Sequence, residues 1–267
     1  APGAKLVVAS GVTLSPRCVI YDGRTVAGGD YTTADWMAGE GTVHVPVVPA
    51  VKRVPTYLSL NGNAYFDTLV RPDHTTRIVF AYRTDDKTVD KPFFGERQAG
   101  FAFGAWAAKY AGNKVNPYIG TSGNLGEKDA VAAGTKGTLD FSAGGLSVNG
   151  TVVYPASAFA PYLNTSLAQY DLPLGAIASN GEIDARKFVG EIYFCSIWKG
   201  GELVRAFVPA VDANDVACLY DGVTKTLFYP LGTGTTAAAA TSEDMKIEDG
   251  VVKCRVTLAT GSAGTVS

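Results

Sequence analysis

Two acidic residues that stand two positions apart give this sequence its clearest opportunity for chemistry. In the stretch GEID, Glu182 and Asp184 would project from the same face of a β-strand, because strand side chains alternate. Retaining glycoside hydrolysis needs two carboxyl groups, and the strand pattern E-x-D-x-x-E supplies them. Here Lys187 occupies the last position, so that strand offers no acid/base residue. We therefore expect no hydrolase activity and interpret residues 179–184 as a turn with solvated charges.

Nucleophilic catalysis and zinc binding both lack the residues that they require. The sequence contains 2 histidines, His44 and His74, and neither forms a persuasive Ser-His-Asp or Cys-His arrangement. No CxxC motif occurs, which excludes a zinc site of the usual spacing. The 4 cysteines are spread widely, and either buried thiols or two disulfides are compatible with their positions: Cys18, Cys195, Cys218 and Cys254.

One segment combines the residue types that recognise sugars. A sugar site needs an aromatic ring to stack on the pyranose and amide groups to bond its hydroxyls. The segment AWAAKYAGNKVNPY contains both kinds of residue, and the candidates are Trp106, Tyr110, Asn113, Asn116 and Tyr118. The alternative interpretation is that Trp106 and Tyr118 belong to the hydrophobic core.

The stretch from Phe188 to Tyr229 must organise the fold that positions these candidates. It contains alternating apolar runs separated by the polar turns KGGE, DAND and DG, a spacing typical of successive antiparallel hairpins. Asn149-Gly150 is another strong hairpin signal. Period-two alternation predicts that six residues of the organising stretch are buried in the core: Ile192, Phe194, Leu203, Phe207, Leu219 and Phe228.

Composition excludes several classes of partner. The chain has 267 residues, of which 46% are hydrophobic and 18% charged, so a substantial core is expected. The net charge is −2, and no basic field exists to attract nucleic acid or anionic membranes. No apolar run approaches the roughly 18 residues of a membrane span. The chain starts at Ala1 without a signal-like segment, as expected for a processed protein.

Composition shifts divide the chain into five parts. Residues 1–48 form a small β module, and residues 49–55 are a proline-punctuated linker or edge strand. Residues 56–234 form the main all-β domain. Residues 235–242 are a small-residue linker, and residues 243–267 either start a further β module or provide a strand that pairs with the N-terminal module.

An ordered set of motifs in the main domain carries a family resemblance. The blocks are YLSLNGNAYFDT, FFGER, VGEIYFCSIWKGGELVRAFVPA, LYDGVTKTLFY and GTG. Together they resemble the laminin-G-like, concanavalin A-like jelly-roll domains of bacterial surface proteins and phage tails. The ending GDYT and GEGTVHV of the first module resembles the repetitive modules of such surface proteins. The resemblance implies a jelly-roll β-sandwich flanked by small β segments, located outside the cell, on a cell surface or on a phage tail.

The resemblance also implies Ca²⁺ as the one cofactor to consider. Such domains bind calcium through carboxylates and carbonyls at a rim. The candidate ligands here are Asp85, Asp86 and Asp90, with a second set in Asp212, Asn214 and Asp215. Neither set has a fixed ligand spacing, and polar turns are the alternative interpretation.

The cysteines allow one covalent connection between the two flanking segments. If residues 243–267 pair with the N-terminal module, Cys18 and Cys254 would be close enough to form a disulfide. Whether Cys195 can reach Cys218 depends on whether their strands pair directly.

We interpret the protein as a non-catalytic adhesion or carbohydrate-binding module of a larger extracellular protein. Its expected partner is a glycan or a host or cell-surface protein. A structural spacer without a small-molecule ligand and a glycoside hydrolase are the alternatives. An exposed aromatic platform beside amides would favour the binder, and a carboxylate pair about 5–5.5 Å apart in an open cleft would favour the enzyme.

Overall fold

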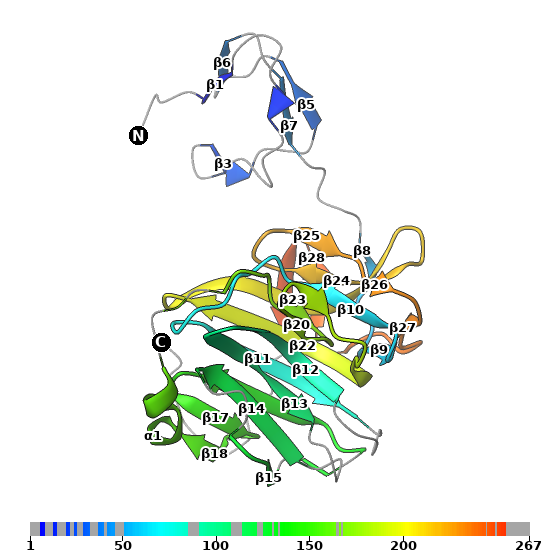
Figure 1. Cartoon of the computed structure of the whole chain (residues 1–267). Coiled ribbons are helices and arrows are strands. Elements are labelled where there is room, and N and C mark those ends of the chain that lie inside the picture. The colour runs from blue at the N-terminus through cyan, green and yellow to red at the C-terminus, as the bar shows by residue number, and fades with distance from the viewer. Residues whose placement is uncertain are drawn as a thin grey trace, which may run out of the picture.

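The main domain is an all-β sandwich of two large, mainly antiparallel sheets, as predicted, and its architecture is compatible with a jelly roll (Figure 1). The computed structural model describes these residues: 6–8, 13–14, 20–21, 24–25, 29–32, 37–39, 42–45, 51–84, 91–107, 114–121, 125–129, 131–132, 134–163, 166, 168–243, 245–248 and 250–254.

One layer, called the nine-stranded sheet for its strands among the described residues, runs in the order β15-β14-β13-β12-β19-β10-β26. The short strand β20 pairs with β12 and with β21. The bounds of its strands are β10 Ala64–Asp67, β12 Lys91–Gln98, β13 Phe101–Ala107, β14 Lys114–Gly120, β15 Lys128–Asp129, β19 Pro173–Leu174, β20 Ala178–Ser179, β21 Glu182–Ile183 and β26 Leu231–Gly232.

The opposite layer, called the eleven-stranded sheet on the same basis, runs in the order β18-β17-β16-β11-β22-β23-β24-β25. Three further strands belong to this sheet: β8 pairs with β23, β9 pairs with β22, and β27 pairs with β9. The bounds are β8 Val51–Arg53, β9 Leu58–Asn61, β11 Arg77–Arg83, β16 Gly137–Ser142, β17 Gly145–Val148, β18 Thr151–Pro155, β22 Val189–Lys199, β23 Glu202–Asp212, β24 Ala217–Asp221, β25 Thr226–Phe228 and β27 Thr235–Ala237.

The remaining elements are short. In the N-terminal part, β1 pairs with β6, β7 pairs with β2 and β5, and β3 pairs with β4. Two helical turns follow β18, and no helix of the described chain has the length and apolar composition needed to cross a membrane. The bounds are β1 Leu6–Val8, β2 Thr13–Leu14, β3 Ile20–Tyr21, β4 Arg24–Thr25, β5 Gly29–Tyr31, β6 Met37–Gly39, β7 Thr42–Val45, α1 Ala156–Phe159, η1 Ala160–Tyr162, β28 Met245–Glu248 and β29 Val251–Cys254.

Turn chemistry fixes the hairpins that the sequence predicted. Asn149 and Gly150 both have positive φ angles, of 51° and 78°, and they connect β17 to β18 as a two-residue turn. Positive φ at both positions matches the twist of the paired strands, and Asn-Gly adopts this conformation readily. The predicted hairpins β22–β23 and β24–β25 are also present.

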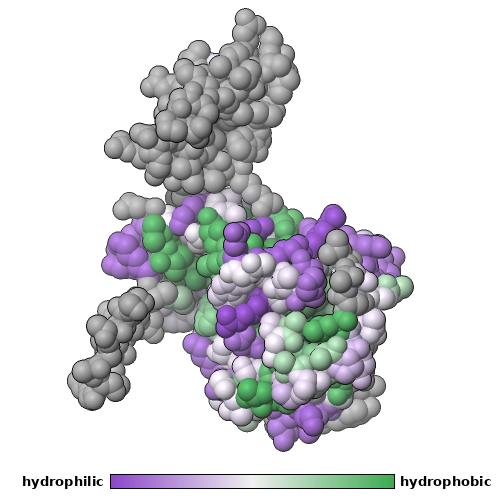
Figure 2. Space-filling model, turned by 90° about the vertical axis from the view of Figure 1, so that its left-hand side faces the viewer, coloured by the Kyte–Doolittle hydropathy of each residue, from purple (hydrophilic) through white to green (hydrophobic). Residues whose placement is uncertain are grey.

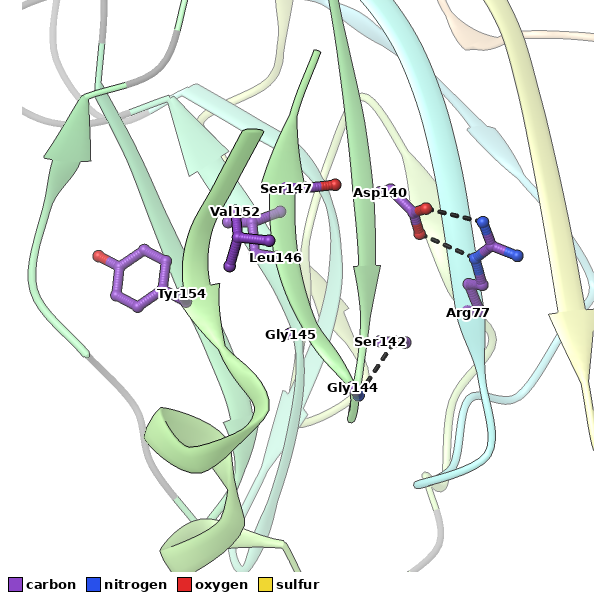
Figure 3. Close-up of a pocket in the computed structure, with 9 residues that line it drawn as sticks. All are labelled: Arg77, Asp140, Ser142, Gly144, Gly145, Leu146, Ser147, Val152 and Tyr154. Atoms are coloured by element: carbon purple, nitrogen blue, oxygen red, sulfur yellow. Dashed lines mark hydrogen bonds and ion pairs between the residues drawn. The ribbon is translucent and has the colours of Figure 1, made fainter. Parts of the chain in front are cut away.

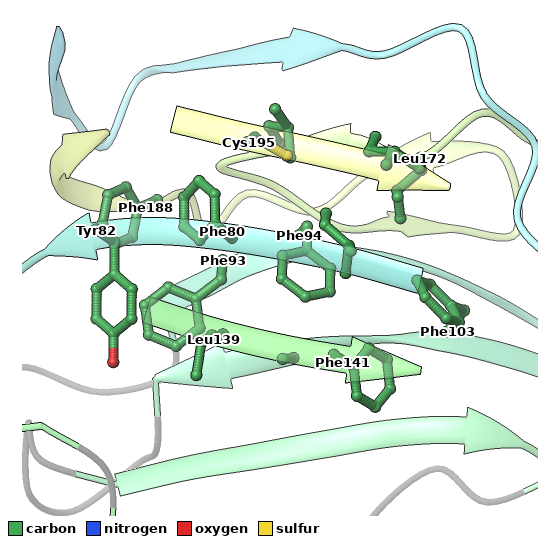
Figure 4. Close-up of a cluster of buried hydrophobic side chains, with 14 of the residues drawn as sticks. Phe80, Tyr82, Phe93, Phe94, Phe103, Leu139, Phe141, Leu172, Phe188 and Cys195 are labelled. Carbon is green, nitrogen blue, oxygen red and sulfur yellow. The ribbon is translucent and has the colours of Figure 1, made fainter. Parts of the chain in front are cut away.

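Aromatic side chains from both sheets fill the space between the layers (Figure 4). Phe80 of β11 lies about 6 Å, between ring centroids, from Phe93 and Phe94 of the opposite sheet and from Phe188, which directly precedes β22. Phe103 of β13 contacts Phe141 of β16 with centroids 4.8 Å apart. Edge and tilted arrangements of this kind add stabilisation beyond the area buried.

Two β-bulges overturn part of the predicted core. Ile192, Phe207 and Leu219 are buried as expected, and Phe228 is half-buried against Phe207. The register of β22 against β11 shifts where Tyr82 pairs with Ile192 and Ala81 with Phe194, so Tyr193 is an extra residue. A bulge reverses which side chains face inward. The prediction for Phe194 was therefore wrong, because it points to the outer face.

The second bulge lies in β23. Ile197 pairs with Arg205, and Trp198 pairs with Leu203, so Val204 is the extra residue. Leu203 consequently shares the outer face with Trp198 and is 42% exposed, which corrects its prediction as a core residue. Arg205 instead is buried, where it donates to the Thr68 carbonyl oxygen over 2.9 Å and lies 3.7 Å from a carboxylate oxygen of Asp221.

Strand β23 also separates two cysteines. Cys195 pairs across to Phe207, and Cys218 pairs across to Ala210 on the other edge of β23. Cys195 belongs to the core between the sheets, whereas Cys218 belongs to a small apolar cluster outside it. Both thiols are buried and free. They do not bond to each other because they lie on opposite faces of one sheet.

The segments flanking the main domain contribute to the sandwich. Within the stretch interpreted as a linker or edge strand, β8 pairs with β23; within the stretch interpreted as the second linker, β27 pairs with β9. Strands β28 and β29 pair with each other, and Met245, Ile247 and Val252 cover the small apolar cluster. The described part of residues 243–267 is thus a hairpin packed on the eleven-stranded sheet.

Candidate functional site

The structure brings together three of the five predicted sugar-binding residues on the outer face of the nine-stranded sheet. Trp106 of β13 pairs directly with Asn116 of β14, and Tyr118 pairs with Gly104. Because Phe103 and Ala105 of the same strand face the core, the alternation places Trp106 on the opposite face. The other two predicted residues, Tyr110 and Asn113, lie outside the described residues.

Trp106, Asn116, Tyr118, Asp184 and Arg186 form a closed group, called here the Trp106 cluster. The Trp106 and Tyr118 rings lie 5.8 Å apart, and the Arg186 guanidinium lies 4.7 Å from the centroid of the Trp106 ring. Two Arg186 nitrogens donate to the Asp184 carboxylate over 2.9 and 2.7 Å. Trp106 is only 3% exposed, although it does not belong to the core between the sheets.

Two polar atoms of this cluster lack hydrogen-bond partners. The Trp106 Nε1–H and the Asn116 Oδ1 are buried and unpaired in the described structure. A donor and an acceptor on neighbouring strands can together hold one hydroxyl group or one water molecule. A larger ligand would reach them only after Arg186 left the indole ring, so the cluster is closed as it stands.

The two carboxylates of the glycosidase-like stretch, residues 182–187, differ in their surroundings: Glu182 lies in solvent and Asp184 is paired with Arg186. Glu182 is exposed on β21, where it pairs with Ser179. The hydrogen bonds from Arg186 lower the pKa of Asp184 to about 2, despite the opposing effect of burial, so this group stays ionised at neutral pH. Asp184 therefore cannot donate a proton to a leaving group there.

One further carboxyl group has a pKa near neutrality, but it faces the interior. Burial raises the pKa of Glu96 to about 7, a value that suits a general acid. Glu96 pairs with Phe103 of the core, is wholly buried, and neither of its oxygens has a hydrogen-bond partner among the described residues. No substrate can contact this group without disruption of the sandwich.

The predicted calcium ligands are not assembled among the described residues. Asp85, Asp86 and Asp90 lie outside them. Asp212 accepts hydrogen bonds from the backbone N–H groups of Asn214 and Val216 and from the Tyr229 hydroxyl, and Asp215 pairs with Lys52. This arrangement is a turn with satisfied carboxylates, and no group of three metal-ligating side chains occurs in the described part of the chain.

The predicted disulfide also falls outside what the structure describes. Cys18 is not among the described residues, and only the backbone of Cys254 is, in strand β29 opposite Met245. The proposed bond between them stays a prediction.

An open trough on the outer face of the eleven-stranded sheet, called here the Arg77 trough, was missed by sequence reasoning. Its first hollow, of about 190 Å³, is lined by Arg77, Asp140, Ser142, Gly144, Gly145, Leu146, Ser147, Val152 and Tyr154 (Figure 3). Its second hollow, of about 410 Å³, is lined by His74, Thr75, Thr76, Arg77, Ser142, Ala143, Gly144, Trp198 and Gly201.

A bidentate ion pair forms the centre of this trough. Arg77 donates to Asp140 through Nε over 2.8 Å and through an Nη over 2.7 Å, and its guanidinium lies 4.8 Å from the centroid of the half-buried Trp198 ring. The register explains the grouping, since Arg77 pairs with Ser142 on one side and with Trp198 on the other. Both charged side chains remain partly exposed, at 47% for Arg77 and 35% for Asp140.

The rim near Trp198 is held by hydrogen bonds between loops. The Gly200 N–H donates to Thr75 Oγ1 over 2.9 Å, and Thr75 Oγ1 donates to Asp73 over 2.6 Å. Lys199 donates to the Arg71 carbonyl oxygen over 2.9 Å and lies 3.3 Å from the Asp73 carboxylate. These bonds position His74 and Thr75 beside Trp198 before any ligand arrives.

The sequence did contain a signal for this trough. The outward residues of β16 are Thr138, Asp140 and Ser142, which alternate with the buried Leu139 and Phe141. The alternation indicates that these residues face outward, but it does not indicate that the outer face is hollowed. Trp198 was interpreted only as part of an apolar strand.

The face that carries α1 in Figure 1 shows no single broad apolar surface. Among its coloured residues, hydrophobic side chains form small separate groups between hydrophilic ones (Figure 2).

No protein-family model matches the chain, and no curated protein matches it. Among solved structures, the chain is similar to a "putative carbohydrate binding protein" from Bacteroides ovatus ATCC 8483, with a TM-score of 0.48 and 10% sequence identity. The match covers 75% of this chain and 63% of that chain, which is less than two thirds of the latter.

Proposed function

We propose that the protein is a non-catalytic carbohydrate-binding module and that the Arg77 trough is its binding site. The observation that carries this proposal is the exposed Arg77–Asp140 pair beside Trp198 in an open trough. Two of the five guanidinium N–H groups are used on Asp140, and the carboxylate oxygens retain acceptor capacity. Neighbouring sugar hydroxyls both donate and accept, so they match such a pair.

The walls of the trough complete this match. Trp198 supplies apolar surface for the C–H groups of a sugar ring, and the serine and threonine hydroxyls supply further hydrogen-bonding groups. Asp140 is the single carboxylate among the lining residues of the trough, and the two carboxylates Glu182 and Asp184 lie elsewhere in the fold. These features support binding without hydrolysis, and an extracellular location fits a glycan ligand.

A glycan panel tests this proposal. Wild-type protein should bind at least one immobilised glycan, and Asp140→Asn should weaken that binding by about ten-fold or more, which corresponds to about 1.4 kcal/mol. The matched control is Asp184→Asn, which breaks the equivalent pair in the Trp106 cluster and should leave binding unchanged. Melting curves of both variants exclude misfolding as the cause.

Three results would overturn the proposal. Absence of binding to every glycan would favour the structural spacer. Loss of binding in Asp184→Asn but not in Asp140→Asn would move the site to the Trp106 cluster. Release of reducing sugar by the wild-type protein, abolished in Glu182→Gln, would show that it is a hydrolase.

A further inference from the structure

The two hollows of the Arg77 trough are neighbours on the outer face of the sheet. They share three lining residues, Arg77, Ser142 and Gly144. We propose that the trough accommodates an extended oligosaccharide chain, with one subsite on each side of this shared section. This inference rests on the proposed function and specifies the class of ligand.

The dimensions of the trough support a ligand longer than one sugar. Its lining residues come from five adjacent strands, in the order β18-β17-β16-β11-β22, and from loops at the ends of these strands. Four inter-strand spacings of about 4.8 Å give a length of roughly 19 Å across the sheet. A single pyranose ring would fill only part of that length. The ligand chain would therefore run across the strands rather than along them.

The two ends of the trough differ in chemistry. The end at β18 presents the 65% exposed Val152 and, from β17, Ser147. The other end presents His74, Thr75 and Trp198. A small, mostly aliphatic end and an aromatic, hydroxyl-rich end would contact two different sugar units. The Arg77–Asp140 pair lies between them, where it can bond hydroxyls from both units.

Gly144 lies in the section that the two hollows share and offers a direct test. It lines both hollows, and a Cβ added to it would lie 3.2 Å from Ser142 Oγ with no other atom within contact distance. Its φ angle is outside the left-handed region, so a side chain there adds little backbone strain. A valine at this position would obstruct the passage between the two subsites without direct contact with either end.

The experiment measures affinity against chain length. Wild-type protein and the variants Gly144→Val and Gly144→Ala are titrated with malto-, cello- and xylo-oligosaccharides, from the monosaccharide to the hexasaccharide. In at least one series, affinity for the wild type should rise by about ten-fold or more between the monosaccharide and the tetrasaccharide. Gly144→Val should abolish that rise with chain length, and Gly144→Ala should show a rise between those of the wild type and Gly144→Val.

The outcomes separate this inference from the proposed function. Equal affinity for monosaccharide and hexasaccharide would overturn the two-subsite trough but would leave carbohydrate binding intact. The two-subsite trough would also be overturned if Gly144→Val kept the full dependence of affinity on chain length while its melting temperature matched that of Gly144→Ala. Absence of binding in all three series would overturn this inference, and the proposed function would fail with it only if the glycan panel also showed no binding.

Discussion

The Trp106 cluster and the Arg77 trough use the same three groups with opposite results. In each, an arginine lies over a tryptophan ring, at 4.7 Å over Trp106 and at 4.8 Å over Trp198. In each, an aspartate holds that arginine through two hydrogen bonds. Trp106 is nevertheless 3% exposed, whereas Trp198 is half-buried at the edge of an open hollow.

The difference comes from the surroundings and not from the three groups. Around Trp106, Tyr118 packs against the ring, and Ile177 fills the space above Gly95 of the neighbouring strand. Around Trp198, the Ala143-Gly144 turn leaves the space beside Arg77 open. The same arginine–aspartate–tryptophan arrangement can thus be a structural element in one place and a candidate binding site in another.

The largest expected effect that tests this contrast is on stability. Trp106→Ala should lower the free energy of unfolding by about 3–5 kcal/mol, because it removes a buried aromatic side chain. Trp198→Ala should cost about 1 kcal/mol, as is usual for a partly exposed residue. Urea denaturation of both variants measures this difference. Equal losses would mean that the two sites do not differ in their contribution to folding.

A second test concerns the interior of the sheet that carries the Trp106 cluster. The pKa of Glu96 rises from its ordinary value of 4.5 to about 7 on folding, which corresponds to about 3 kcal/mol. The folded state therefore binds this proton more tightly than the unfolded state. The stabilisation is complete below about pH 4.5 and is lost as the pH rises through 7.

Glu96→Gln should remove this part of the pH dependence. Denaturation curves recorded below pH 4.5 and above pH 7 would give similar stabilities for the variant and different ones for the wild type. The exposed Glu182→Gln serves as the control and should retain the wild-type profile. A wild-type stability that stays constant across this range would contradict the prediction.

A smaller effect should distinguish the two ion pairs. Asp184→Asn should destabilise the protein by about 1 kcal/mol at neutral pH, and Asp140→Asn by less, because the more exposed pair is better screened by water. The hydrogen bonds from Arg186 lower the pKa of Asp184 from 3.8 to about 2. Its stabilisation is present above about pH 4 and is lost as the pH falls towards 2, where wild type and Asp184→Asn should converge.

The last test measures accessibility and not stability. In a Trp36→Phe background, the variants Trp106→Phe and Trp198→Phe each leave one tryptophan, and acrylamide quenching reports how accessible it is. The protein that retains Trp198 should be quenched several-fold more strongly than the one that retains Trp106, because of their different burial. Similar quenching constants would show that the Trp106 cluster is open in solution.

The sequence alone determined the fold class, most hairpins and half of the predicted core. Alternating apolar residues specify which side of a strand faces inward, and Asn149-Gly150 specifies its turn, because these are local properties of the chain. Alternation also placed Phe207 and Leu219 in the core correctly. Local rules were sufficient wherever the strands stayed in regular register.

Only the tertiary structure decided the rest. The extra residues Tyr193 and Val204 reverse the faces of their neighbours, and a bulge has no signature in the alternation that it interrupts. The Trp106 cluster joins residues 106 and 186, and the Arg77 trough joins residues 77, 140 and 198, through strand pairings that lie far apart in sequence. Whether a tryptophan is covered or accessible depends on such long-range packing, and no local pattern encodes it.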